Sequence, residues 1–421
     1  MRMTRVFAAS IASFVIVAAL YGTAHNMPMF GRKYQLECNS CHTVIPKLTE
    51  MGFNFRAAGF RMPDDIGAED KEVNNVSTQM STRLQTRYDL ARTDNAGVKT
   101  DKSQLAFHEV TFYPLTGAFN KNYSSLFELS IAPEEPVEIE NAYVRGDWKT
   151  ANGFLSGRVG IFHPFEGAGA SDRPAAIDRP LFQVTPAKFN QSTFFTPWNF
   201  DESGLELGYT QNRTSIRATL FNGITFDDGE GIAHPAQTQG GALGKDPSRP
   251  DYHSKDAQLF FNQILNPGGG AFSLFYYRGV IALPIVGDSL DRYFNDTFDR
   301  YAAYASYPVV PRLVLLAGAQ QGKDDTYTLA KAYGEKSTST GFFGEADADL
   351  GGNAVLLGRY DSFDPSNKVD KNEISGETLA LNKPFNNGLQ LITQYRYTQT
   401  KQGAKADKKT NAFQARLIWI W

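Results

Sequence analysis

Two cysteines and a histidine near the amino end of the chain have the spacing of a haem attachment site. They form the sequence Cys38-Asn39-Ser40-Cys41-His42, in which two thiols one turn apart can form thioethers to a porphyrin and the next imidazole can bind the iron. Cys38 and Cys41 are the only two cysteines, so no structural disulfide elsewhere requires them. We predict one covalently bound haem c with His42 as its proximal ligand. A reversible disulfide and half of a metal site are the alternatives.

The first residues have the features of an export signal. Arg2 and Arg5 precede an apolar run from Val6 to Leu20, and small residues follow up to Ala24. The run is shorter than the roughly 20 residues that a helix needs to span a bilayer, which argues against an amino-terminal anchor. We therefore predict a signal peptide over residues 1–24 and haem maturation in the periplasm of a Gram-negative cell.

Most of the remaining chain alternates between apolar and polar residues, as half-buried β-strands do. From about Val76 to Trp421, short segments rich in Tyr, Phe, Thr and Gly are separated by clusters of Asn, Asp, Gly and Pro. The last segment places Phe413, Leu417 and Trp419 on one face. The composition agrees, with 42% hydrophobic and 13% aromatic residues and a net charge of only −3, because barrel strands carry lipid-facing residues in alternate positions. We expect an all-β outer-membrane barrel surrounded by lipid, with no nucleic-acid partner; a soluble all-β protein is the alternative.

The turns indicate a barrel of sixteen antiparallel strands. Short turns, from Lys149–Gly153 to Pro384–Gly388, fall on one side and long loops on the other, as in outer-membrane porins. This alternation requires His163–Ser203 to be one extracellular loop, whose prolines are poor strand material. This would be the third extracellular loop, which in many sixteen-stranded porins folds inward and narrows the channel. The predicted strands lie near Gln79–Ala91, Gln104–Phe112, Tyr123–Ile131, Glu138–Asp147, Phe154–Phe162, Gly204–Gln211, Ser215–Phe221, Ala257–Leu265, Ala271–Ile281, Tyr293–Tyr307, Arg312–Ala319, Ser339–Leu350, Asn353–Ser362, Glu373–Leu381, Leu389–Thr398 and Asn411–Trp421.

The segment between the export signal and the barrel, residues 25–75, is too short to enclose a haem and also build a core of its own. A sixteen-stranded barrel encloses more space than its own side chains fill. We therefore predict that residues 25–75 form a small α-helical monohaem cytochrome c plug with its linker, and that residues 76–421 form a porin-like barrel around it.

Further motifs surround the haem-binding residues. In order they are Pro28-x-Phe30-x-Arg32, Cys38-x-x-Cys41-His42, Pro46-x-Leu48, Gly52-x-x-Phe55 and Gly59-Phe60-x-Met62. Together they resemble the amino-terminal domain of the fused outer-membrane monohaem cytochrome-porins. Thr49 and Phe60 depart from the Asn and Tyr that are common in that family, and neither touches the iron.

The resemblance implies an electron-transfer function. Members of the family are known or proposed to oxidise extracellular Fe(II) and to pass the electron inward, through a haem held in the barrel, to a periplasmic c-type cytochrome. The resemblance also implies Met62 as the sixth iron ligand, since a thioether stabilises ferrous haem and raises its potential. Met51, Met27, Met29 and His25 are the alternatives.

Arginines and aromatic residues complete the predicted site. We expect Arg32 and Arg56 to pair with the haem propionates, with ordinary salt bridges as the alternative. Two other functions stay open, namely outward delivery of electrons to external metal and a solute porin with a structural or sensory haem. A homotrimer, common among porins, is also possible. The aromatic residues expected to pack on the porphyrin and against the lumen are Phe30, Phe53, Phe55 and Phe60.

Overall fold

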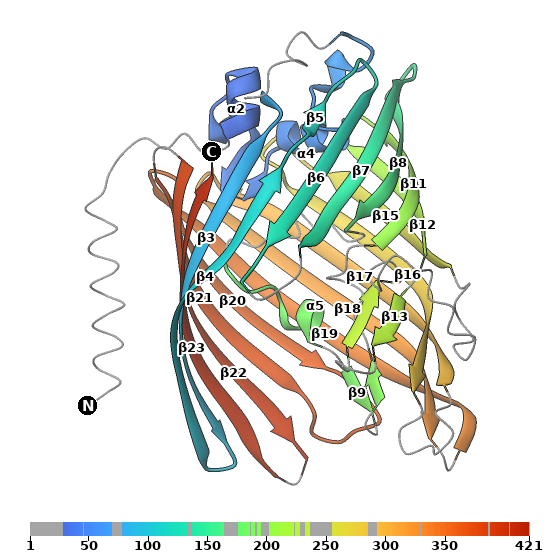
Figure 1. The fold of residues 1–421 in the computed structure, drawn as a ribbon, viewed down its shortest axis with the longest axis vertical. Helices are drawn as coiled ribbons and strands as arrows, with labels where there is room; N and C mark the ends of the chain where they lie inside the picture. The colour runs from blue at the N-terminus through green and yellow to red at the C-terminus, as the bar shows by residue number, and fades with distance from the viewer. Residues whose placement is uncertain are drawn as a thin grey trace.

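The computed structural model shows a barrel with a group of short helices at one end (Figure 1). The signal peptide, His25, Met27 and Trp421 lie outside the residues that the structure describes. The described residues are 28–44, 46–69, 78–133, 137–163, 176–185, 187–189, 192–194, 202–222, 224–227, 232–235, 255–284, 293–328, 331–385, 388–403 and 405–420.

The barrel consists of sixteen antiparallel strands and is closed. Its strands are β3 Ser81–Asn95, β4 Val98–Tyr113 with its continuation β5 Thr116–Ala118, β6 Tyr123–Ile131, β7 Glu138–Lys149, β8 Phe154–Phe162, β11 Glu202–Gln211, β12 Thr214–Phe221, β15 Asp256–Ile264, β16 Ala271–Pro284, β17 Tyr293–Val310, β18 Leu313–Thr328, β19 Lys331–Gly351, β20 Ala354–Asp364, β21 Ile374–Pro384, β22 Leu389–Gln402 and β23 Lys405–Ile420. β4 and β5 count as one interrupted strand because both pair with β6. Neighbouring strands follow one another in the chain, and β23 closes the barrel by pairing with β3.

The structure confirms the sixteen predicted strands, but not all of the predicted long loops. Residues 92–103 were expected to form a loop, whereas β3 and β4 continue to Asn95 and from Val98, and only Ala96 and Gly97 form the turn, with φ of 53° and 89°. Strands β18 and β19, and β22 and β23, are likewise joined by short connections on this side. These extensions lack alternation because both of their faces are polar, so the sequence pattern stops where lipid no longer covers one face.

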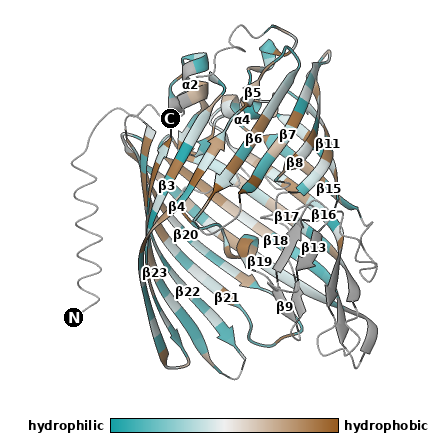
Figure 2. Cartoon of the chain, in the orientation of Figure 1, coloured by the Kyte–Doolittle hydropathy of each residue, from teal (hydrophilic) through white to brown (hydrophobic). Residues whose placement is uncertain are grey.

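Apolar and polar residues separate between the two faces of the wall. On β11, Leu205 and Leu207 are 49% and 63% exposed on the outside, whereas Glu206 between them is 2% exposed. Figure 2 shows this alternation along the strands, and it also shows hydrophilic ends on β22 and β23, far from the helices. No helix among the described residues is long and apolar enough to cross a bilayer.

Part of the connection between β8 and β11 folds into the barrel. In its described stretch, 176–185, a helical turn α5 (Leu181–Val184) places Phe182 at 0% exposure against rings of the inner wall. The backbone N–H of Leu181 donates to Asp361 on β20 at 2.8 Å. The short pairs β9 (Ala187–Phe189) with β10 (Ser192–Phe194), and β13 (Ile224–Asp227) with β14 (Ile232–Pro235), are separate from the barrel sheet.

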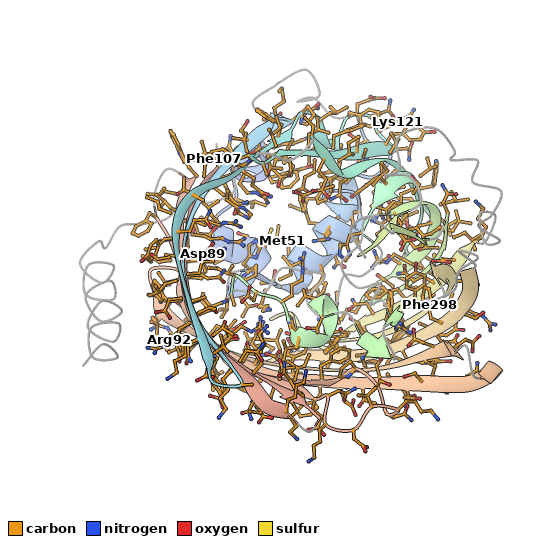
Figure 3. All side chains as sticks on the ribbon, turned by 60° about the horizontal axis from the view of Figure 1, so that its bottom comes forward. Met51, Asp89, Arg92, Phe107, Lys121 and Phe298 are labelled. Carbon is orange, nitrogen blue, oxygen red and sulfur yellow. The ribbon has the colours of Figure 1, made fainter. Side chains whose placement is uncertain are left out.

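The short helices occupy the barrel mouth on the side of the short turns. We call residues 28–69 the plug; it contains α2 Pro28–Tyr34, α3 Cys38–Cys41, β1 His42–Val44, β2 Lys47–Leu48, α4 Glu50–Ala57 and the 3-10 turn η1 Pro63–Asp65. The backbone N–H of Glu50 donates to Pro267 in the β15–β16 turn at 3.1 Å, and the Arg61 guanidinium donates to Asn120 and Lys121 after β5 at 2.9 and 2.8 Å. Figure 3, which looks into the barrel, shows Met51 of α4 within the ring of strands.

Candidate haem-binding site

The Cys-x-x-Cys sequence forms a single helical turn. α3 begins at Cys38 and ends at Cys41, so the two positions lie one turn apart, which is the spacing that two thioethers to one porphyrin require. His42 follows directly as the first residue of β1. The backbone thus brings the three predicted attachment residues together at the barrel mouth.

Hydrogen bonding to the backbone holds the His42 ring. Its Nδ1 lies 3.1 Å from the carbonyl oxygen of Pro46, and because a carbonyl can only accept, Nδ1 carries the hydrogen. Burial lowers the pKa of His42, which keeps the ring neutral. A neutral imidazole with hydrogen on Nδ1 has its lone pair on Nε2. This is the form in which histidine binds iron, with the other nitrogen fixed by a backbone carbonyl, so the residues present fit a haem ligand.

A short hairpin places the Pro46 carbonyl beside His42. β1 and β2 pair His42 with Leu48 and Val44 with Lys47, which brings Pro46 to the tip of the hairpin. Pro46 and Leu48 therefore shape a hairpin, and the helix that follows begins only at Glu50.

Helix α4 packs directly against the cysteine turn. A Cβ on Gly52 would lie 2.2 Å from the Cys41 carbonyl oxygen, so only glycine permits this approach. Thr49 caps α4 by accepting from the Gly52 N–H at 3.2 Å, and it also donates to the Ser40 carbonyl at 2.9 Å. Threonine is a good helix cap, so Thr49 begins α4 and also ties it to the cysteine turn.

Lys47 joins this hairpin to the barrel wall. It is 5% exposed, and its Nζ lies 3.3 Å from Glu345 and 3.8 Å from Asp347, which face inward from β19. Glu345 in turn pairs with Arg359 on β20 at 3.4 Å. Sequence reasoning missed Lys47, because a lysine between ordinary neighbours is normally solvated.

The ion pairs continue from the wall to the inward stretch 176–185. Arg359 pairs with Asp361 at 3.3 Å, and Arg396 pairs with Asp361 and Asp178 at 3.2 Å each. The plug and the inward stretch are thus connected through buried charges on β19, β20 and β22.

The predicted aromatic residues separate into two groups. Phe30, Phe55 and Phe60 pack on one another, with the rings of Phe30 and Phe60 stacked at 5.2 Å, and Tyr34, which sequence reasoning missed, joins them edge-on against Phe55 at 5.3 Å. Phe53 instead packs against Ile264 and Ala271 of the wall, as expected for a lumen contact.

The other predicted site residues occupy different parts of the plug. Met62 is half-buried just before η1, where its carbonyl accepts from the Asp65 N–H at 2.9 Å. Met51 is half-buried on α4, and Met29 on α2 is 6% exposed. Arg32 belongs to α2, and Arg56 lines a hollow between α4 and the barrel wall.

Several solved structures share the architecture of this barrel. The outer-membrane channel DcaP of Acinetobacter baumannii has a TM-score of 0.53 and 10% identity, with 81% of this chain and 97% of that chain covered. The anion-selective porin from Comamonas acidovorans has a TM-score of 0.52 and 12% identity, over 81% and 99%. OmpT of Vibrio cholerae, in a trimer form, has a TM-score of 0.51 and 11% identity, over 81% and 99%. No protein-family model and no curated protein matches the chain.

These likenesses identify the class of fold. The chain has the fold of the outer-membrane porins, a closed antiparallel barrel of sixteen strands. At identities of 10–12% they establish the fold alone.

Proposed function

We propose that this chain is an outer-membrane electron conduit with one covalently bound haem c in the mouth of its barrel. The observation that carries the proposal is the hydrogen bond of 3.1 Å from Nδ1 of His42 to the Pro46 carbonyl. It leaves Nε2 of a neutral ring for a metal, immediately after two cysteines one turn apart. A histidine that served only for packing would not need this combination.

The proposal assigns a role to each predicted residue. Cys38 and Cys41 form the thioethers, His42 is the proximal ligand, and Met62 is the sixth ligand. Arg32 pairs with a propionate. Haem iron, when bound, would gain and lose one electron, so this electron transfer needs no catalytic acid, base or nucleophile.

The position of the plug supports a periplasmic redox partner for the haem. The plug contacts the short turns, which in outer-membrane barrels face the periplasm, so a periplasmic c-type cytochrome is the proposed acceptor. Extracellular Fe(II) is the proposed donor, and it approaches from the opposite mouth. The hydrocarbon layer of about 30 Å excludes both partners, so a conduit must lie within the barrel. Outward flow to an external metal uses the same parts in reverse.

A solute porin with a structural or sensory haem is the second candidate. Its support is the barrel itself, since DcaP is described as a channel and the Comamonas protein as an anion-selective porin. The likeness to these proteins agrees with this candidate without requiring a haem. The trimer form of OmpT supports a homotrimer for either candidate.

Two measurements on purified full-length protein test the proposal. Mass spectrometry of the peptide containing Cys38 and Cys41 should find one covalent haem, and Cys41→Ser should remove that attachment. Anaerobic Fe(II) mixed rapidly with oxidised protein should then reduce the haem within turnover times. Unmodified cysteines would refute the conduit. An attached haem that Fe(II) does not reduce, together with solute flux in a liposome-swelling assay, would favour the porin.

A further inference from the structure

A hollow between the plug and the barrel wall has an unusual lining. It opens to solvent and lies between α4 and the inner faces of β7, β8, β11, β12 and β15. Four arginines line it, and no carboxylate does so among the described residues around it. The arginines are Arg56 from α4, Arg145 from β7, Arg158 from β8 and Arg217 from β12.

Aromatic rings orient two of these guanidinium groups. Arg158 lies over the ring of Phe162, 3.9 Å from its centroid, and Arg217 lies over the ring of Phe260 at 4.3 Å. When a guanidinium stacks on an aromatic ring, its N–H groups point outward in the guanidinium plane. There they can form bidentate hydrogen bonds to the oxygens of an oxyanion.

Buried carboxylates of the wall fix the positions of these arginines. Asp147 pairs with Arg145 at 2.8 Å, while Glu206 pairs with Arg158 at 2.8 Å and lies 4.0 Å from Arg217. Arg145 and Arg158 are only 7% and 6% exposed, so water screens their charges poorly.

We propose that this hollow binds an oxyanion, either a carboxylate or a phosphate group. Neutral donors complete the lining, since Asn54 and Asn262 carry amides and Ser156, Thr210 and Ser215 carry hydroxyls. Phe53 and Ile264 add an apolar side to the hollow. A carboxylate on an apolar skeleton, or a small free anion, matches this combination.

The oxyanion can come from two sources. Arg56 lies one helical turn after Gly52, the residue of α4 that packs on the Cys41 carbonyl, so a propionate of a haem held by the motif is one source. This form of the inference rests on the proposed function. A free anion that enters from the mouth is the other source, and it requires no haem.

Titration of the full-length protein with inorganic phosphate, followed by calorimetry, tests the site. Haem-free Cys38→Ser/Cys41→Ser protein should bind phosphate, and adding Arg56→Gln/Arg217→Gln should weaken binding about tenfold or more, because charge-assisted hydrogen bonds are lost. This double variant leaves the Arg145–Asp147 and Arg158–Glu206 ion pairs intact. Arg312→Gln, on the exposed β17–β18 turn, is the matched control and should not change the affinity.

The haem-attached protein then distinguishes the sources. Loss of phosphate binding upon haem attachment identifies a propionate as the occupant, and retained binding identifies a free anion. The inference is overturned if haem-free protein shows no saturable binding, or if the arginine double variant binds as the Arg312→Gln control does. Neither result would affect the haem attachment, which is measured separately by mass spectrometry.

Discussion

Replacing Lys47 by methionine should loosen the plug from the barrel while the barrel stays folded. Methionine keeps the approximate length of the side chain and removes its charge. Glu345 and Asp347, which are 5% and 0% exposed, would then keep Arg359 as the nearby cation among the described residues. Two carboxylates would remain in a space that water hardly reaches, and the plug would no longer compensate them.

The structure sets the size of this effect. At an effective dielectric constant of about 20, the attraction is roughly 5 kcal/mol across 3.3 Å and roughly 4 kcal/mol across 3.8 Å, before desolvation is subtracted. Measured losses when one partner of a buried pair is removed are about 3–5 kcal/mol. Since about 1.4 kcal/mol corresponds to a factor of ten, the undocked plug should become roughly a hundredfold to a few thousandfold more populated.

Limited proteolysis measures that population, because cleavage of the plug follows the free energy of its local opening when opening is fast. Lys149→Met is the matched control. Its Nζ donates to the Asp64 carbonyl at 2.6 Å, but Lys149 is exposed and should contribute at most about 1 kcal/mol.

A rescue experiment can refute the reasoning. If uncompensated carboxylates cause the loss, adding Glu345→Gln and Asp347→Asn to Lys47→Met should restore most of the protease resistance. Equal cleavage of Lys47→Met and Lys149→Met, or a triple variant no more resistant than Lys47→Met alone, would show that the buried charges do not hold the plug.

Three further changes test other contacts. Gly52→Ala should destabilise the packing of α4 on the cysteine turn by about 1–3 kcal/mol, since its Cβ would lie 2.2 Å from the Cys41 carbonyl oxygen. Gly344→Ala, with nothing within 4 Å of the new Cβ, should be neutral in the same proteolysis assay. Arg213 donates to Glu50 at 2.8 and 2.7 Å, and this hydrogen bonding lowers the pKa of Glu50. The pair therefore stabilises docking above the ordinary pKa of glutamate, and this stabilisation disappears as the pH falls through the lowered pKa of Glu50. Glu50→Gln should cost at most about 1 kcal/mol of docking free energy at neutral pH and nothing in strong acid. A difference between the two proteins that does not change with pH would contradict this. Met62→Ala should change the haem spectrum and lower its redox potential, and unchanged values in a redox titration would eliminate Met62 as a ligand.

The sequence predicted the barrel well because contact with lipid requires apolar residues at alternate positions of each strand. Where one face of a strand meets hydrocarbon and the other meets the lumen, apolar and polar residues must alternate, as Leu205, Glu206 and Leu207 illustrate. Beyond the lipid both faces are polar, so the extension of β3 and β4 to the Ala96-Gly97 turn left no such pattern.

The site was predictable only where chemistry fixes residue types and spacing. The cysteine spacing and the following histidine are what thioether attachment of a haem would require, and α3 has the corresponding single turn. The contacts that hold this part of the plug come from residues far away in the chain, such as Glu345 on β19, and no local sequence pattern predicts them. Gly52 is similar, because its need to be glycine arises from the approach of another backbone.

The orientation of His42 depends on the barrel through a short series of contacts. The Pro46 carbonyl accepts the Nδ1 hydrogen of His42, and Lys47, the next residue, is fixed by Glu345 on the wall. If the hairpin undocked, the Pro46 carbonyl would move with it and the His42 ring would hydrogen-bond to water instead. The Pro46 carbonyl would then no longer select one tautomer of His42. The barrel therefore does more than enclose the plug: its inner charges fix the backbone group that decides which nitrogen of His42 is open to a metal. A plug of this size lacks the buried surface to hold that geometry alone, which gives a physical reason for the plug and the barrel to be one chain.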